Sequence, residues 1–172
     1  MTAMISLAGN NKEGDHKSQT KKTVIDTNQI LWHSYDEGLK LAVETERPIM
    51  VNFTTTWCGY CKKMNRTTFV DSEIVNILNN DFISIKVDGD SQNELNVDGY
   101  KITERNLTRS EYGVRGYPTY WFLKSNAERI GPISGYKATD PFLDVLYYVR
   151  DEVYDKMKFD EYMKNGGRKG NY

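Results

Sequence analysis

The pattern of hydrophobic and polar positions predicts alternating helices and strands along most of the chain. Ser34 followed by Glu37 is typical of a helix start, and Pro48 ends the apolar stripe that follows. An apolar run and an alternating run further on predict strands. In chain order, the expected elements are helix 34–46, strand 48–53, helices 62–66 and 73–78, strand 82–88, helix 104–112, strands 119–123 and 128–133, and helix 140–162.

Helices and strands that alternate in this way favour an α/β fold. The strands at 48–53 and 82–88 are separated by helical segments, so we expect them to be parallel. Only a short turn separates 119–123 from 128–133, which predicts an antiparallel hairpin. A parallel pair of strands together with an antiparallel hairpin predicts a mixed sheet.

Three segments lack hydrophobic periodicity. We expect residues 1–28 and 164–172 to be disordered tails, because the first is rich in polar residues and the second in glycine and basic residues. One domain is then expected at 29–163. Residues 89–108 are too polar and too long for an ordinary connection, so they are expected to be an inserted, solvated loop.

Composition and charge exclude several classes of function. The formal net charge of −1 gives no general attraction to nucleic acid or to an anionic membrane. No apolar run reaches the roughly 18–20 residues of a membrane span, and no leader is recognised at residues 1–9. The chain has 2 cysteines and 2 histidines in all, which is too few for a regular structural zinc site, so no metal or other cofactor is expected.

Both cysteines fall in one C-x-x-C motif, Cys58 and Cys61, between an expected strand and an expected helix. A disulfide this short closes too small a loop to stabilise the fold, which favours a redox role. Helix N-termini lower thiol pKa values and favour the reactive thiolate. We therefore expect Cys58 to be the nucleophile and the more buried Cys61 to resolve the mixed disulfide.

The sequence around this motif resembles the thioredoxin family. The residues that carry the resemblance, over roughly 30–162, are Trp57-Cys58-Gly59-Tyr60-Cys61-Lys62, Lys86-Val87-Asp88 and Tyr112-Gly113-Val114-Arg115-Gly116-Tyr117-Pro118-Thr119. Trp32, Arg47-Pro48, Phe69 and Asp71 make it more similar to bacterial extracytoplasmic thioredoxin-like oxidoreductases. The resemblance implies a three-layer α/β/α sandwich.

The resemblance also implies roles for residues around the cysteines. Pro118 would follow a cis peptide bond beside the motif and present the backbone of Tyr117 to a substrate chain. Beside this resemblance, the residue types themselves predict that Trp57 and Tyr60 shield the cysteines or contact substrate, with packing under the loop as the alternative for Trp57. Lys62 would add positive potential, with a solvated side chain on the helix surface as the alternative.

Two positions depart from the thioredoxin pattern. Asn52 stands where thioredoxins carry a buried aspartate, so the usual proton acceptor is replaced. Gly59 and Tyr60 separate the cysteines where thioredoxin has Gly-Pro, and Gly-Tyr also occurs in bacterial disulfide isomerases of the superfamily. The direction of electron flow therefore stays open.

The sequence thus predicts an enzyme, a thiol–disulfide oxidoreductase acting as a reductase or electron relay. An isomerase or oxidase is the alternative, and a Cu(I)-binding thiol protein is the alternative from another class. Expected partners are a protein disulfide and an upstream thiol reductant, with no nucleic acid and no membrane span. A monomer is expected in the periplasm or another extracytoplasmic compartment, with the cytoplasm as the alternative.

Overall fold

The computed structural model describes residues 28–170 of the chain. The tail expected at residues 1–28 therefore lies outside the described residues, except for residue 28. Residues 171 and 172 also lie outside them. Within the described part, every helix is too short or too polar to span a bilayer.

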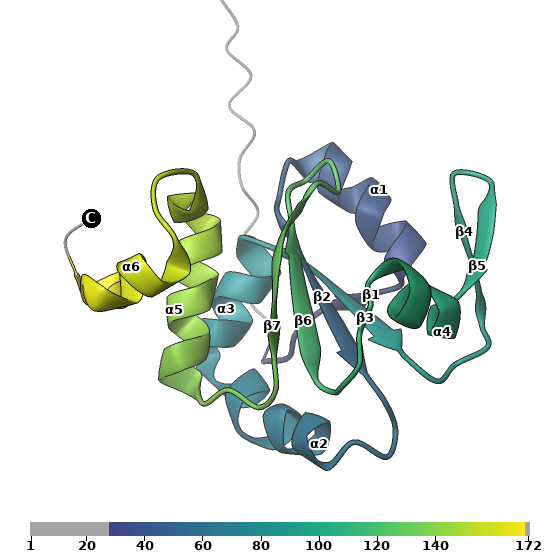
Figure 1. The fold of residues 1–172 in the computed structure, drawn as a ribbon, viewed down its shortest axis with the longest axis horizontal. Helices are drawn as coiled ribbons and strands as arrows, with labels where there is room; N and C mark the ends of the chain where they lie inside the picture. The colour runs from purple at the N-terminus through teal and green to yellow at the C-terminus, as the bar shows by residue number, and fades with distance from the viewer. Residues whose placement is uncertain (1–27, 171–172) are drawn as a thin grey trace, which may run out of the picture.

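A five-stranded mixed sheet forms the centre of the domain, in the order β1-β3-β2-β6-β7 (Figure 1). Its strands are β1 (Trp32–His33), β2 (Ile49–Thr54), β3 (Ile83–Asp88), β6 (Thr119–Leu123) and β7 (Arg129–Ser134). The central strand β2 is parallel to β3 and antiparallel to β6, and β6 and β7 form a hairpin. The predicted α/β class with a mixed sheet is confirmed.

Helices cover both faces of the sheet. They are α1 (Tyr35–Thr45), α2 (Gly59–Arg66), α3 (Ser72–Asn80), α4 (Glu104–Asn106), α5 (Thr139–Arg150) and α6 (Phe159–Lys164). Successive residues of β2 point to opposite faces. Val51 and Phe53 pack with residues of α1, whereas Met50 packs with residues of α3 and α5. This arrangement gives the three layers that the resemblance implied.

Local capping explains why two of these helices begin where the sequence predicts. The Ser34 Oγ accepts a hydrogen bond from the backbone N–H of Glu37 at the start of α1. Asp71 accepts from the N–H groups of Glu73 and Ile74 at the start of α3. These bonds satisfy donors that a helix leaves unpaired at its first turn.

The segment expected to be an inserted loop, 89–108, is in fact structured. It contains an antiparallel hairpin of β4 (Glu94–Val97) and β5 (Tyr100–Thr103), followed by α4 and a π-helical turn at Leu107–Glu111. Asp98 and Gly99, at the tip, both have positive φ, as a tight hairpin turn requires. The hairpin is held because Leu95 and Ile102 are buried against the α1 side of the core.

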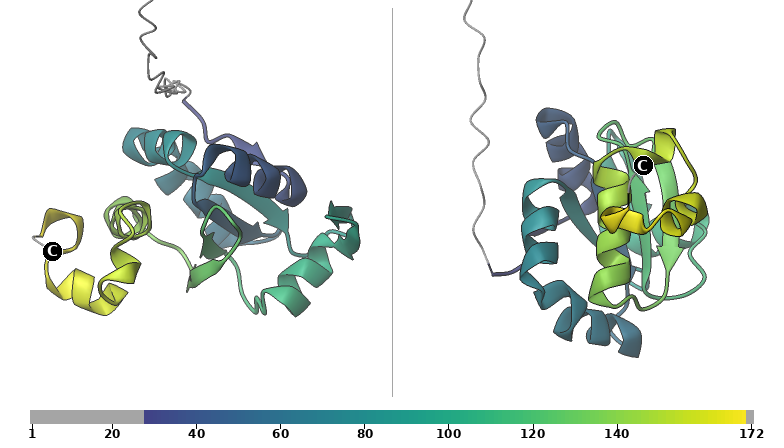
Figure 2. Two further views of the ribbon diagram at one scale, coloured as in Figure 1. Left: turned by 90° about the horizontal axis from the view of Figure 1, so that it is seen from above. Right: turned by 90° about the vertical axis from the view of Figure 1, so that its left-hand side faces the viewer.

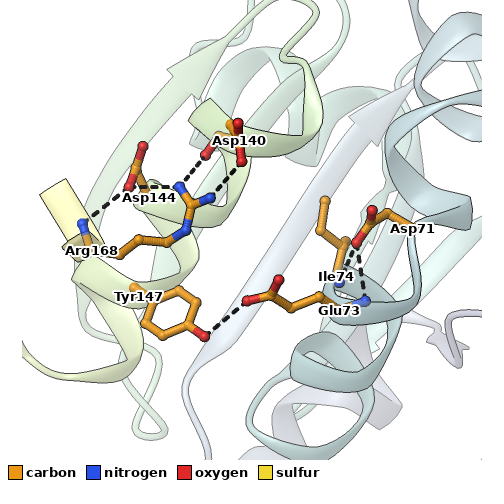
Figure 3. A network of polar contacts seen from close by, with 7 residues as sticks. All are labelled: Asp71, Glu73, Ile74, Asp140, Asp144, Tyr147 and Arg168. Carbon is orange, nitrogen blue, oxygen red and sulfur yellow. Dashed lines mark hydrogen bonds and ion pairs between the residues drawn. The ribbon is translucent and has the colours of Figure 1, made fainter.

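The end of the chain also differs from expectation. The predicted helix 140–162 is instead α5, a short turn and α6, and residues 167–169 form a further turn. Residues 164–170 are therefore not a disordered tail. Arg168 contacts Asp140 and Asp144 of α5 (Figure 3), and α6 lies beside α5 in both views of Figure 2. This ion pair joins residues far apart in sequence, which local patterns do not reveal.

Candidate active site

The two cysteines lie where β2 gives way to α2. They form a disulfide with Cα atoms 5.3 Å apart, and Cys58 is the N-cap of α2. The backbone N–H of Cys61 donates to the Sγ of Cys58 at 3.0 Å. Unpaired N–H groups and the helix dipole at this position stabilise negative charge on sulfur. The site therefore favours the thiolate that disulfide exchange requires.

Aromatic side chains stand exposed beside this nearly buried disulfide. Cys58 and Cys61 are 3% and 5% exposed, so the expected difference in burial between them is absent in the disulfide form. Trp57 and Tyr60 are 65% and 63% exposed. A partner that reaches the disulfide must therefore meet these two rings.

The loop before β6 carries the second element of the site. The Tyr117–Pro118 peptide bond is cis, as the resemblance implied. The rings of Tyr117 and Trp57 meet edge to face with centroids 5.8 Å apart, which brings this loop against the residue that precedes Cys58. The Pro118 carbonyl accepts from Gly135, so β7 holds the loop in place.

Asn52 is buried at 3% exposure in the middle of β2. Among the described residues its Oδ1 has no hydrogen-bond partner. Its neighbours across the sheet are Tyr120 on β6, whose hydroxyl is also buried without a partner, and Lys86 on β3, which is exposed. Neither of these two cross-strand neighbours is a carboxylate.

Asp90 and Arg109 complete the site, and sequence reasoning missed both. The indole Nε1–H of Trp57 donates to Asp90 Oδ2 at 2.6 Å, and the guanidinium of Arg109 donates to Asp90 Oδ1 at 2.9 Å. Asp90 lies just past the end of β3, where polar side chains gather at the same sheet edge as those after β2. The place of Asp90 in the site could thus have been predicted from the sequence. The place of Arg109 could not, because it depends on how the segment 89–111 folds.

The chain that follows β7 contacts α2 at two neighbouring residues. The ammonium of Lys63 lies 4.1 Å from the ring centroid of Tyr136, and Met64 accepts a hydrogen bond from the backbone N–H of Lys137. Lys62, the residue expected to add positive potential, is exposed. Within residues 28–170, no three His, Cys, Asp or Glu side chains gather in a way that could hold a metal ion.

Comparison with known proteins agrees with the resemblance to the thioredoxin family. The sequence model of the thioredoxin-like domain family matches residues 35–150. Thiol:disulfide interchange protein DsbD of Campylobacter jejuni is 33% identical over 116 residues, which are 64% of this chain and 18% of that protein. Protein disulfide-isomerase tigA of Aspergillus niger is 32% identical over 113 residues, which are 64% of this chain and 28% of that protein. The chain thus spans less than a third of either relative.

A solved thioredoxin from Thermus thermophilus is also similar, with 31% identity and a TM-score of 0.58. The similarity covers 70% of this chain and 87% of that one. The chain belongs to the thioredoxin-like domain family. Family membership, the Cys58–Cys61 disulfide and its place at a helix N-terminus together support thiol–disulfide oxidoreductase activity.

Proposed function

We propose that this protein reduces disulfides of other proteins, as a reductase or as an electron relay. The observation that carries the proposal is the position of Cys58, at the N-cap of α2 and next to exposed aromatic rings. A thiolate at this position is stabilised, and a protein chain that approaches it first meets the exposed rings of Trp57 and Tyr60.

The chemistry is two successive thiol–disulfide exchanges. The Cys58 thiolate attacks one sulfur of a substrate disulfide. A bond forms between them, the substrate S–S bond breaks, and the second substrate sulfur leaves as a thiolate that takes up a proton. Cys61 loses its proton and attacks the Cys58 sulfur, which releases the first substrate sulfur as a thiol. The substrate gains two electrons, and the protein is left with the disulfide that the structure contains.

The protein must then be reduced again, because each cycle ends with Cys58 and Cys61 oxidised. An upstream thiol reductant supplies two electrons by the same exchange in reverse order. The name of the Campylobacter relative, a thiol:disulfide interchange protein, supports such a relay between thiol proteins. We also propose that the protein acts in the periplasm or another extracytoplasmic compartment, on the resemblance carried by Trp32, Arg47-Pro48, Phe69 and Asp71. We further propose that Tyr117 offers its backbone to the substrate chain, and that the protein acts as a monomer.

An isomerase or oxidase is the second proposal. Gly59 and Tyr60 between the cysteines favour it, as does similarity to a relative named protein disulfide-isomerase. The reduction potential separates the two. A reductase is expected near about −270 mV, and an oxidant near about −120 mV.

Equilibration with glutathione buffers, read by alkylation of free thiols, measures this potential. A value below about −230 mV supports the reductase or relay, and a value above about −180 mV supports the alternative. The Cys58→Ser/Cys61→Ser variant is the matched control, because it has no dithiol and a disulfide that closes so short a loop contributes little to the fold.

A further inference from the structure

Four side chains form a closed cluster on the substrate-facing side of the disulfide. The Trp57 indole donates to Asp90, and Asp90 also accepts from Arg109. Tyr117 closes the cluster, because its ring meets that of Trp57 edge to face and its hydroxyl lies beside the guanidinium of Arg109. Trp57 and Tyr117 immediately precede Cys58 and Pro118, so the cluster holds the two residues that flank the redox centre.

Arg109 acts on Tyr117 as well as on Asp90. Burial raises the pKa of the Tyr117 phenol, the Asp90 carboxylate raises it further, and the Arg109 guanidinium beside it offsets part of the rise. Arg109 belongs to the segment 89–111, and the first residue of that segment also lies against Tyr117. A Cβ at Gly89 would overlap the Tyr117 hydroxyl. A guanidinium offers several donors in a planar fork, which suits contact with two groups at once.

We propose that Arg109 is a positioning residue: through Asp90 it holds the Trp57 ring against Tyr117, so that the segment 89–111 shapes the surface on which a protein substrate docks. The inference rests on the proposed function, because it concerns substrates of that same site. Arg109 lies in the π-helical turn Leu107–Glu111, a distortion that often occurs at functional sites. Its side chain touches neither sulfur, so it acts through Trp57 and Tyr117.

Stability does not explain this cluster. The Arg109 and Asp90 side chains are 49% and 38% exposed, and ion pairs this exposed contribute little to folding. The consequence of the contact is instead geometric. Without Arg109, Asp90 keeps its charge but loses the group that fixes its direction, and the exposed Trp57 ring gains freedom next to the disulfide. A docking protein must then order that ring on binding.

The test compares Arg109→Gln with Arg105→Gln, which removes the same charge from an exposed position on the same segment. We expect Arg109→Gln to lower kcat/KM for insulin reduction about tenfold, mainly through KM, because misplacement of a docking surface weakens productive binding. Hydroxyethyl disulfide is too small to use that surface, so its rate should change by less than about twofold. Arg105→Gln should match the wild type on both substrates, and Arg109→Lys should fall between.

Two further measurements show whether Arg109 acts through Trp57. In a Trp57→Phe background, Arg109→Gln should lose most of its effect on insulin, because residues of one contact network are not additive. The indole N–H resonance of Trp57 should shift in Arg109→Gln and stay in place in Arg105→Gln, with Trp32 and Trp121 as internal references.

The outcomes separate this inference from the proposed function. If the wild type reduces insulin and Arg109→Gln does so equally well, the positioning role is wrong. If the wild type itself reduces no protein disulfide, the proposed function fails. The indole resonance then decides the Arg109 contact alone: an unmoved signal overturns it, and a shifted one supports it.

Discussion

Asn52 and Tyr120 lie directly opposite each other on β2 and β6, and each buries a polar atom that has no partner among the described residues. An unsatisfied buried polar group costs about 1–3 kcal/mol. Packing alone does not account for such a cost in the strand that leads to the cysteines. It is also where thioredoxins, by resemblance, carry an aspartate.

The variant Asn52→Asp tests this position. Burial should raise the pKa of the new carboxyl above its ordinary value of about 3.9. A raised pKa in the folded state means that the stabilising protonated form is lost as pH rises. The variant should therefore lose about 1.4 kcal/mol of stability for each unit of that rise, between pH ~4 and the new pKa.

The same carboxyl should add an ionisation to the pH–rate profile of the step in which Cys61 attacks. Asn65→Asp is the matched control, because it makes the same change at an exposed position on α2. Its profile should follow the wild type. An Asn52→Asp profile identical to that of the wild type would contradict a link between this position and Cys61.

Tyr120→Phe removes a buried hydroxyl that makes no hydrogen bond among the described residues. We expect the variant to gain about 1 kcal/mol in urea unfolding at pH 7, because the desolvation cost disappears. Burial raises the pKa of Tyr120 far above its ordinary value. Above pH ~10 the tyrosine therefore ionises in the unfolded chain but not in the folded protein, which lowers the stability of the wild type. The variant lacks this loss, so its stability should fall less steeply in alkali by about 1.4 kcal/mol per pH unit. A less stable variant at pH 7 would mean that the hydroxyl has a partner.

The C-terminal contact of Arg168 should stabilise the fold without affecting the redox site. Its side chain and that of Asp144 are 11% and 13% exposed, and the two are joined at 2.9 Å. Arg168→Gln leaves the mostly buried Asp144 charge without its cation, so we expect a loss of about 2 kcal/mol in urea unfolding. Lys101→Gln breaks a pair whose members are 70% and 65% exposed, and should cost less than about 0.5 kcal/mol. Equal losses in the two variants would show that the terminal turn is not held by this ion pair.

The two cysteines should behave differently when replaced one at a time. Cys61→Ser leaves the nucleophile but removes the resolving thiol, so it should accumulate mixed disulfides with protein substrates. Cys58→Ser should form almost none, because Cys61 lies one turn inside α2. Non-reducing electrophoresis after acid quenching measures both. Mixed disulfides that form mainly on Cys58→Ser would reverse the assigned roles.

The parts of the fold that follow from local chemistry could be predicted from the sequence. Ser34 and Asp71 cap their helices as expected, and the C-x-x-C lies at the strand-to-helix junction. The hairpin of β4 and β5 was missed although its signal was present. Asp98-Gly99 stands between two short runs in which apolar and polar residues alternate, and this is a strong turn signal. The polar composition of the whole segment nevertheless favoured a loop.

Long-range contacts could not be read from the chain. Arg168 pairs with Asp140, and Arg109 pairs with Asp90, across intervening elements. No periodicity links such residues, because their proximity depends on how helices and loops pack on the sheet. The identity of the residues opposite Asn52, Lys86 and Tyr120, likewise depends on the register of the sheet.

Insulin reduction driven by dithiothreitol tests the central claim most directly. The wild type should accelerate precipitation of the insulin chains well above the rate with dithiothreitol alone, and Cys58→Ser/Cys61→Ser should not. A wild type that is no faster than this double variant would contradict the account that Cys58 and Cys61 exchange electrons with protein disulfides.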